Sequence, residues 1–93
     1  MLSKMPMNLE KVVEEKLDME ILRAAIIAEL DAINLYEQFA LTTENEDLKK
    51  VLLEVAKEEK THVGEFQTLL LKIDKEQAEE LEKGRKEVET LTG

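Results

Sequence analysis

The chain has 93 residues, no cysteine and a formal net charge of −9, from 22 acidic and 13 basic side chains. Without cysteine, disulfides and thiolate centres such as rubredoxin or iron–sulfur sites are excluded, so any metal must be bound by oxygen and imidazole. The negative charge disfavours nucleic acid and anionic membranes as partners, and no apolar run approaches the roughly 18 residues of a membrane span. Because no signal peptide is evident either, we expect a soluble, intracellular, single-domain protein over residues 1–93.

The residue pattern predicts an all-α fold, because the chain has only one proline and three glycines to interrupt helices, and no segment alternates apolar with polar side chains. Residues 1–17 are expected to form an N-terminal extension. This extension either stays loose or adds a short amphipathic piece that contains Leu9, Val12, Val13 and Leu17. The first long helix is expected over 19–40, directly after Asp18, which is a suitable N-cap.

A second helix is expected over 44–73, where Thr43 and Glu46 have the spacing of a capping box. The link between the two helices is only a few residues long, which predicts an antiparallel hairpin. A third, shorter helix is expected over 75–91, with Asp74 as its N-cap. One side of this helix carries the apolar residues Ala78, Leu81, Val88 and Leu91.

The apolar surface of the first helix is too wide for a single partner. One seam consists of Leu22, Ala25, Ala32, Tyr36 and Phe39, and the neighbouring seam consists of Ile26, Leu30, Ile33 and Ala40. A hairpin buries only one face of each helix, so the other seam needs a further partner. The simplest partner is a second copy of the hairpin, which would complete a four-helix bundle with C2 symmetry.

Polar side chains interrupt the inward-facing stripes of both long helices. Glu29 occupies a place in the first seam, and Glu59 and His62 replace two successive apolar residues in the second helix. The stripe of the second helix otherwise consists of Leu48, Leu52, Val55, Phe66, Leu69 and Ile73. No Lys or Arg lies on either stripe, and burying ionised carboxylates without a partner costs several kcal/mol each.

A metal ion would neutralise this charge, and carboxylate plus neutral imidazole is a ligand set for iron, manganese or zinc. Glu59 and His62 are neighbours on one helical face, and Glu29 lies at nearly the same height in an antiparallel hairpin. Ferritin-like di-iron bundles use a Glu from each of two helices and a Glu-x-x-His from each of the other two. One hairpin supplies half of this set, so the hypothesis requires a homodimer, with two irons per dimer.

Each of these residues also has a structural alternative. A lone Glu-x-x-His occurs by chance in acidic helices, and Glu29 is a surface residue if the register of its helix differs. Tyr36 is either a hydrogen-bond donor or a redox-active residue close to the metals, or it is a core aromatic whose hydroxyl finds some other partner. Four further acids either guide cations or are solvated helix charges, namely Asp31, Glu37, Glu58 and Glu65.

The segments "EILRAAIIAELDAINLYEQFA" and "VLLEVAKEEKTHVGEFQTLLLKID" resemble the encapsulated ferritins, in particular the archaeal ferritin-like domain that is joined to an encapsulin shell protein. The resemblance runs from about Met19 to the end of the chain. It implies that two-helix subunits pair around a di-iron ferroxidase centre and that the dimers form a ring-shaped decamer. It assigns Glu29, Glu59 and His62 as ligands from each subunit, with Tyr36 near the site.

The sequence departs from the bacterial members of this family at two places. Leu35 stands where they have a tryptophan before the tyrosine, and Ala28 replaces one of two acids at the metal entrance, with Asp31 at the other position. These changes concern a secondary metal site and not the main centre.

The resemblance and the residue pattern together predict a ferroxidase, an Fe(II):oxygen oxidoreductase. It would supply iron for mineral storage inside a cytoplasmic encapsulin nanocompartment, with the encapsulin shell protein as partner. One alternative is an erythrin-like peroxidase that uses the same di-iron site. The other is a non-catalytic, metal-binding helical scaffold or cargo adaptor.

Overall fold

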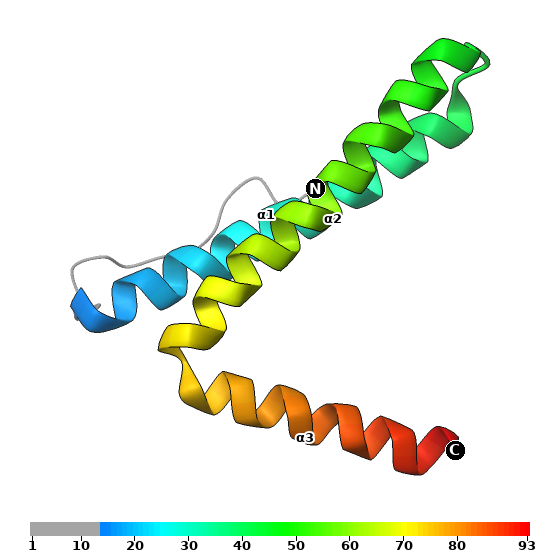
Figure 1. The fold of residues 1–93 in the computed structure, drawn as a ribbon. Helices are drawn as coiled ribbons and strands as arrows, with labels where there is room; N and C mark the ends of the chain where they lie inside the picture. The colour runs from blue at the N-terminus through cyan, green and yellow to red at the C-terminus, as the bar shows by residue number, and fades with distance from the viewer. Residues whose placement is uncertain (1–13) are drawn as a thin grey trace.

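The computed structural model describes residues 14–93, which form three α-helices (Figure 1). Helix α1 spans Glu14–Thr42, α2 spans Glu46–Ile73 and α3 spans Lys75–Thr92. Helices α1 and α2 lie side by side in antiparallel directions, and α3 leaves the end of α2 at a sharp angle, so that the molecule is V-shaped. The predicted all-α hairpin with a shorter C-terminal helix is confirmed. No helix within 14–93 is both long enough and apolar enough to cross a membrane.

Helix α1 is longer than predicted at both ends. It begins at Glu14 and ends at Thr42, so Asp18 lies inside the helix and is not its N-cap, and the last part of the expected extension over 1–17 is helical. The Glu and Lys residues of this segment are good helix formers, which explains why the helix continues past the expected cap. Of the expected amphipathic piece, Leu17 belongs to α1, while Leu9, Val12 and Val13 lie outside the described residues.

The start of α2 also differs from the prediction, because Asn45 and not Thr43 is the N-cap. The Oδ1 atom of Asn45 accepts a hydrogen bond of 2.9 Å from the backbone N–H of Leu48. The hydroxyl of Thr43 accepts a bond of 3.2 Å from the N–H of Asn45, and Glu46 is the first helical residue, so the predicted capping box is wrong. Asparagine is a stronger N-cap than threonine, which accounts for the later start.

Among the described residues, the buried apolar side chains form a narrow seam between α1 and α2. They are Ile33 at 8%, Ala40 at 2%, Ala56 at 2% and Leu70 at 5% relative exposure. Ile33 and Ala40 belong to the second of the two predicted seams of α1, so these two residues face α2 inside the hairpin, whereas Leu30 of the same seam is 49% exposed. The stripe that carries Glu29 lies beside the buried seam and stays partly exposed. The hairpin therefore leaves much of its apolar surface uncovered.

Candidate metal centre

Three side chains with metal-ligating atoms meet on one side of the hairpin. Glu29 of α1 and Glu59 and His62 of α2 each offer one ligand atom, and the three atoms lie within 4.8 Å of one another. The Nδ1 atom of His62 is 3.4 Å from Oε2 of Glu29 and 3.3 Å from Oε2 of Glu59. The structure thus brings together the three residues that the sequence analysis selected.

The helix register explains this convergence. Glu59 and His62 are one turn apart on α2, so their side chains project from the same face. Glu44, in the loop between the helices, is 15 residues from Glu29 (44 − 29) and 15 residues from Glu59 (59 − 44). With equal rise per residue in both helices, these two carboxylates reach the same level of the antiparallel pair.

The centre carries net negative charge. The side chains of Glu29 and Glu59 are only 21% and 19% exposed, and His62 is 41% exposed. Two ionised carboxylates face one imidazole, so at least one negative charge is uncompensated even when the imidazole is protonated. Among the ion pairs of residues 14–93, no Lys or Arg pairs with either carboxylate. A cation at this position would relieve the cost of holding these charges partly away from water.

The spacing of the donor atoms fits a shared metal ion better than it fits hydrogen bonds. Separations of 3.3 and 3.4 Å are long for a bond between an imidazole nitrogen and a carboxylate. Ligand atoms that are each about 2.1 Å from one ion are roughly 3.0 to 3.4 Å apart at the usual ligand–metal–ligand angles. Carboxylate oxygen plus imidazole nitrogen is also a donor set that first-row divalent metals accept.

The other predicted site residues do not join this group. Tyr36 lies two turns beyond Glu29 on α1 and is partly buried. Glu37 pairs with Lys60 of α2 at 3.1 Å, so its charge is compensated. Asp31 is partly buried on α1, while Glu58 and Glu65 are exposed on α2. Within the described part of the chain, only Glu29, Glu59 and His62 form a cluster of three or more potential ligands.

Two ion pairs between distant residues were not anticipated from the sequence, namely Glu37–Lys60 and Arg23–Asp74. Periodicity assigns residues to helix faces but does not say which exposed charges reach across to a neighbouring helix. Asp74 was expected only to cap α3, yet its carboxylate also binds Arg23 of α1 at 2.6 Å. Asp74 is buried, at 8% exposure, and the sequence alone did not predict this burial.

The metal-ligand cluster lies within an exposed apolar face of the hairpin. Several large apolar side chains of the same two stripes are half exposed, namely Phe39 at 47%, Leu48 at 47%, Leu69 at 52% and Ile73 at 43%. A groove of about 350 Å³ continues this face toward the open end of the hairpin. It is lined by Asp18, Ile21, Leu22, Leu69, Lys72 and Ile73. We refer to the surface of these two stripes, from Leu22 to Phe39 and from Leu48 to Ile73, as the site face.

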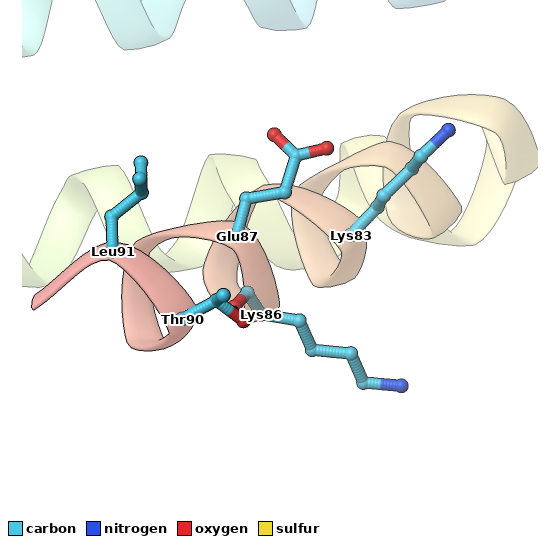
Figure 2. A pocket seen from close by; sticks show the side chains of 5 residues that line it. All are labelled: Lys83, Lys86, Glu87, Thr90 and Leu91. Carbon is cyan, nitrogen blue, oxygen red and sulfur yellow. The ribbon is translucent and has the colours of Figure 1, made fainter. Parts of the chain in front are cut away.

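A second hollow, of about 540 Å³, lies far along the chain on α3 and is lined by Lys83, Lys86, Glu87, Thr90 and Leu91. Figure 2 shows that these side chains all project from one helix, with Lys83, Glu87 and Leu91 directed to the same side. Within residues 14–93 all of its lining residues belong to α3, so it is the open flank of this helix and not a binding cavity.

Comparison with known proteins agrees with this architecture. A family model described as rubrerythrin matches residues 20–92. A ferritin-like–encapsulin shell fusion protein from Pyrococcus furiosus is 65% identical over 75 residues, which is 81% of this chain and 22% of the relative. An encapsulin nanocompartment cargo protein from Myxococcus xanthus is 47% identical over 57 residues, which is 61% of this chain and 44% of the relative. The chain therefore spans less than half the length of either curated relative.

A solved structure has the same fold as the described residues. The crystal structure of the encapsulated ferritin domain from Pyrococcus furiosus superposes with a TM-score of 0.86 at 57% identity, covering 99% of this chain and 96% of that one. The superposition includes α3 as well as the hairpin that carries the donor cluster. The chain thus belongs to the rubrerythrin family of ferritin-like domains and, within it, to the encapsulated ferritins.

Proposed function

We propose that this protein is a ferroxidase that oxidises iron(II) to iron(III) at a di-iron centre shared by two copies of the chain. The observation that carries the proposal is the position of Glu29, Glu59 and His62. Their donor atoms lie within 4.8 Å of one another, and all three side chains stay partly exposed. One chain offers an ion three protein donors from one side only.

A second copy related by C2 symmetry would complete the set. Two chains together provide four carboxylates and two imidazoles, which is the ligand set of ferritin-like di-iron bundles. The apolar side chains around the donors would then be buried between the copies. This arrangement gives the half-exposed Phe39, Leu48, Leu69 and Ile73 a partner and forms the four-helix bundle. We extend the same proposal to the ring-shaped decamer that the family resemblance implies.

Iron(II) is the substrate in this scheme, and the side chains have distinct tasks. The carboxylates of Glu29 and Glu59 attract and bind the two ions, and His62 contributes a neutral imidazole to each of them. Oxidation of two iron(II) ions releases two electrons, which together with two protons from solvent convert dioxygen to hydrogen peroxide. Tyr36, on the same stripe of α1, is proposed as a positioning residue near the ions.

The relatives suggest where the product goes. One relative is named as a fusion with an encapsulin shell and another as an encapsulin cargo protein. The molecule is V-shaped and measures 47 × 43 × 18 Å, and its described residues, 14–93, enclose no internal space in which a mineral could grow. We therefore propose that the oxidised iron is stored inside a cytoplasmic encapsulin nanocompartment and that the shell protein is the partner.

The rubrerythrin family match favours one further candidate, a peroxidase that uses the same donors. The two functions differ in the oxidant that accepts electrons from iron(II). Iron(II) oxidation measured with dioxygen and, anaerobically, with hydrogen peroxide separates them. A ferroxidase is expected to turn over with dioxygen, whereas a peroxidase would be fast only with peroxide.

The decisive experiment is aerobic iron(II) oxidation, followed by the absorbance of the ferric product. The unaltered protein, Glu29→Ala and Glu54→Ala are compared, because Glu54 is an exposed glutamate of α2 outside the cluster and serves as the matched control. We expect fast oxidation that only Glu29→Ala abolishes. Equal rates for all three proteins would reject the site, and no acceleration over buffer would favour the non-catalytic scaffold.

A further inference from the structure

Helices α2 and α3 are separated by a single non-helical residue, Asp74, with φ −109° and ψ 87°. A sharp turn between helices normally uses glycine or proline, because these residues stop a helix locally. The sequence around the turn, "LLLKIDKEQAEE", contains neither of them. The local sequence offers only the N-cap Asp74, and a cap does not set the direction of the next helix. The bend therefore depends on contacts with the rest of the fold.

Asp74 is bound by all three helices. Its backbone N–H donates to the carbonyl of Leu70 in α2 at 2.8 Å, and its carboxylate accepts the N–H of Gln77 in α3 at 3.0 Å. The guanidinium of Arg23 in α1 donates to the same carboxylate at 2.6 Å. Among the described residues, Asp74 is the one buried charged side chain.

The bend lacks three backbone hydrogen bonds that a continuous helix would form. In a continuous helix the N–H groups of residues 75, 76 and 77 would bind the carbonyls of residues 71, 72 and 73. None of these bonds forms at the bend between α2 and α3, which we call the elbow. The backbone bonds there run from the N–H of Asp74 to the carbonyl of Leu70 and from the N–H of Ala78 to the carbonyl of Asp74. The Asp74 carboxylate replaces only the bond of Gln77. The guanidinium of Arg23 adds a contact from α1 to the same carboxylate.

The surroundings of the pair offer Arg23 a second acceptor. Lys16, Glu20 and Glu76 line the same small pocket as Arg23 and Asp74, so α1 contributes one further base and one acid, and α3 contributes one acid. The Oε2 atom of Glu20 is buried without a hydrogen-bond partner. Glu20 is also one turn before Arg23 on α1, which is a favourable spacing for an ion pair. If the Arg23 side chain leaves Asp74, it can therefore pair with the carboxylate of Glu20.

We infer that the Arg23–Asp74 ion pair is a latch that keeps α3 bent, and that α2 and α3 straighten into one continuous helix when the latch opens. An apolar groove of about 310 Å³ on the inside of the elbow gives the bend only modest additional support, because Leu81, which lines it, is still 44% exposed. In the bent state α3 leaves the end of α2 at a sharp angle (Figure 1). In the straight state α3 would continue along the axis of α2. The ion pair thereby determines the position of the apolar side chains of α3 that other molecules can contact. These side chains are Leu81, Val88 and Leu91.

A distance measurement distinguishes the two states. Because the chain has no cysteine, Glu44→Cys in the loop and Glu87→Cys near the end of α3 can carry a fluorophore pair. An excess of unlabelled protein restricts energy transfer to labels within one chain. Straightening would separate the two positions by roughly 60 Å, from the rise of a continuous helix. The bent molecule extends 47 × 43 × 18 Å along its principal axes.

The test variants are Arg23→Met, which removes the donor, and Asp74→Asn, which keeps a good N-cap but loses the charge. Glu82→Gln is the control, because it removes an ion pair inside α3 that does not touch the elbow. We expect longer distances in both test variants and the original distance in the control.

Hydrogen exchange of the backbone amides of Lys75 and Glu76 gives an independent readout. These amides have no helical acceptor in the bent state and gain one in a continuous helix, so their exchange should slow in the two test variants. Unchanged distances would overturn the inference. Longer distances with faster exchange would also overturn it, since they would mean that α3 detaches or unfolds. Neither readout depends on iron, so a failed ferroxidase assay leaves this test intact.

Discussion

The Nδ1 atom of His62 lies 3.4 Å from the Oε2 atom of Glu29, although the two residues are 33 positions apart in the chain. The contact joins α1 to α2 halfway along the hairpin. Two further ion pairs link α1 to other helices on either side of it, Arg23–Asp74 toward the elbow and Glu37–Lys60 toward the loop. These outer pairs are matched in charge, whereas the central cluster has two acids and one imidazole. The imbalance at the centre is therefore a local property of the site, and it leads to the first prediction.

Glu29→Gln is expected to stabilise the metal-free protein, contrary to the usual effect of altering a partly buried residue. Two carboxylates whose ligand atoms lie within 4.8 Å repel each other by about 1 kcal/mol even in water-like surroundings. Removing one charge should raise the free energy of unfolding by a similar amount in the presence of a chelator. Urea denaturation measures this change, with Glu54→Gln as a control that should have little effect. Destabilisation by Glu29→Gln would show that the carboxylate makes a structural contact.

Chelation is expected to shift the protein toward smaller species. In the proposed dimer, bound metal stabilises only the assembled form, so its removal weakens association by mass action. Sedimentation velocity with and without a chelator measures the shift, and added iron(II) under anaerobic conditions should reverse it. His62→Ala should lose the response to metal. A size that does not change on chelation would mean that apolar burial alone holds the copies together.

Acid is expected to destabilise the elbow through Asp74. The hydrogen bond from the N–H of Gln77 and then the guanidinium of Arg23 lower the pKa of this carboxyl below its ordinary value of 3.8. A folded-state pKa below the unfolded one stabilises the protein above the unfolded pKa. The stabilisation declines as the pH falls below about 4 toward the folded-state pKa. Urea unfolding of the unaltered protein and of Asp74→Asn between pH 6 and pH 2.5 tests this.

The stability difference between the unaltered protein and Asp74→Asn should shrink as the pH falls. A constant difference over this range would mean that the charge of Asp74 does not contribute to stability. Glu82, whose pKa is lowered by the hydrogen bond from Arg85, provides an internal comparison within α3. Glu82→Gln should reduce the acid sensitivity of α3 without affecting the elbow.

Sequence periodicity predicted the helical hairpin and the meeting of Glu29 with Glu59 and His62, because both follow from a fixed rise per residue and a short loop. It did not predict which seam of α1 packs inside the chain. Ile33 and Ala40 face α2, whereas the stripe of Glu29 lies at the side, and both stripes are apolar enough for either role. The sequence also did not show which of two polar residues caps α2. The choice of Asn45 over Thr43 depends on the local path of the loop.

The bend at Asp74 could not be predicted for a related reason. The sequence correctly predicted that Asp74 is an N-cap, because its side chain accepts a hydrogen bond from the backbone N–H of Gln77. A cap alone, however, does not set the direction of the next helix. That direction depends on Arg23, which is 51 positions away in the chain. Local propensity therefore accounts for the elements, and long-range pairing accounts for how they are joined.

The proposed dimer makes a directional prediction about two leucines of α2 with matched exposure. Leu69 lies on the site face and is 52% exposed, whereas Leu53 is 48% exposed and lies on nearly the opposite side of the helix, by the periodicity of 100° per residue. Leu69→Glu should place a charge in the interface and convert the dimer to monomer. Leu53→Glu should leave the dimer intact. Sedimentation velocity measures the association state of both variants.

Iron(II) oxidation by the same two variants connects assembly to activity. If each chain holds only half of the ligand set, Leu69→Glu loses oxidation although Glu29, Glu59 and His62 are all unchanged. Raising the protein concentration should restore the rate per chain, because activity then follows the fraction of dimer. Full activity of a monomeric Leu69→Glu protein would show that one hairpin suffices. In that case the three donors of a single chain would be the complete protein contribution to the centre.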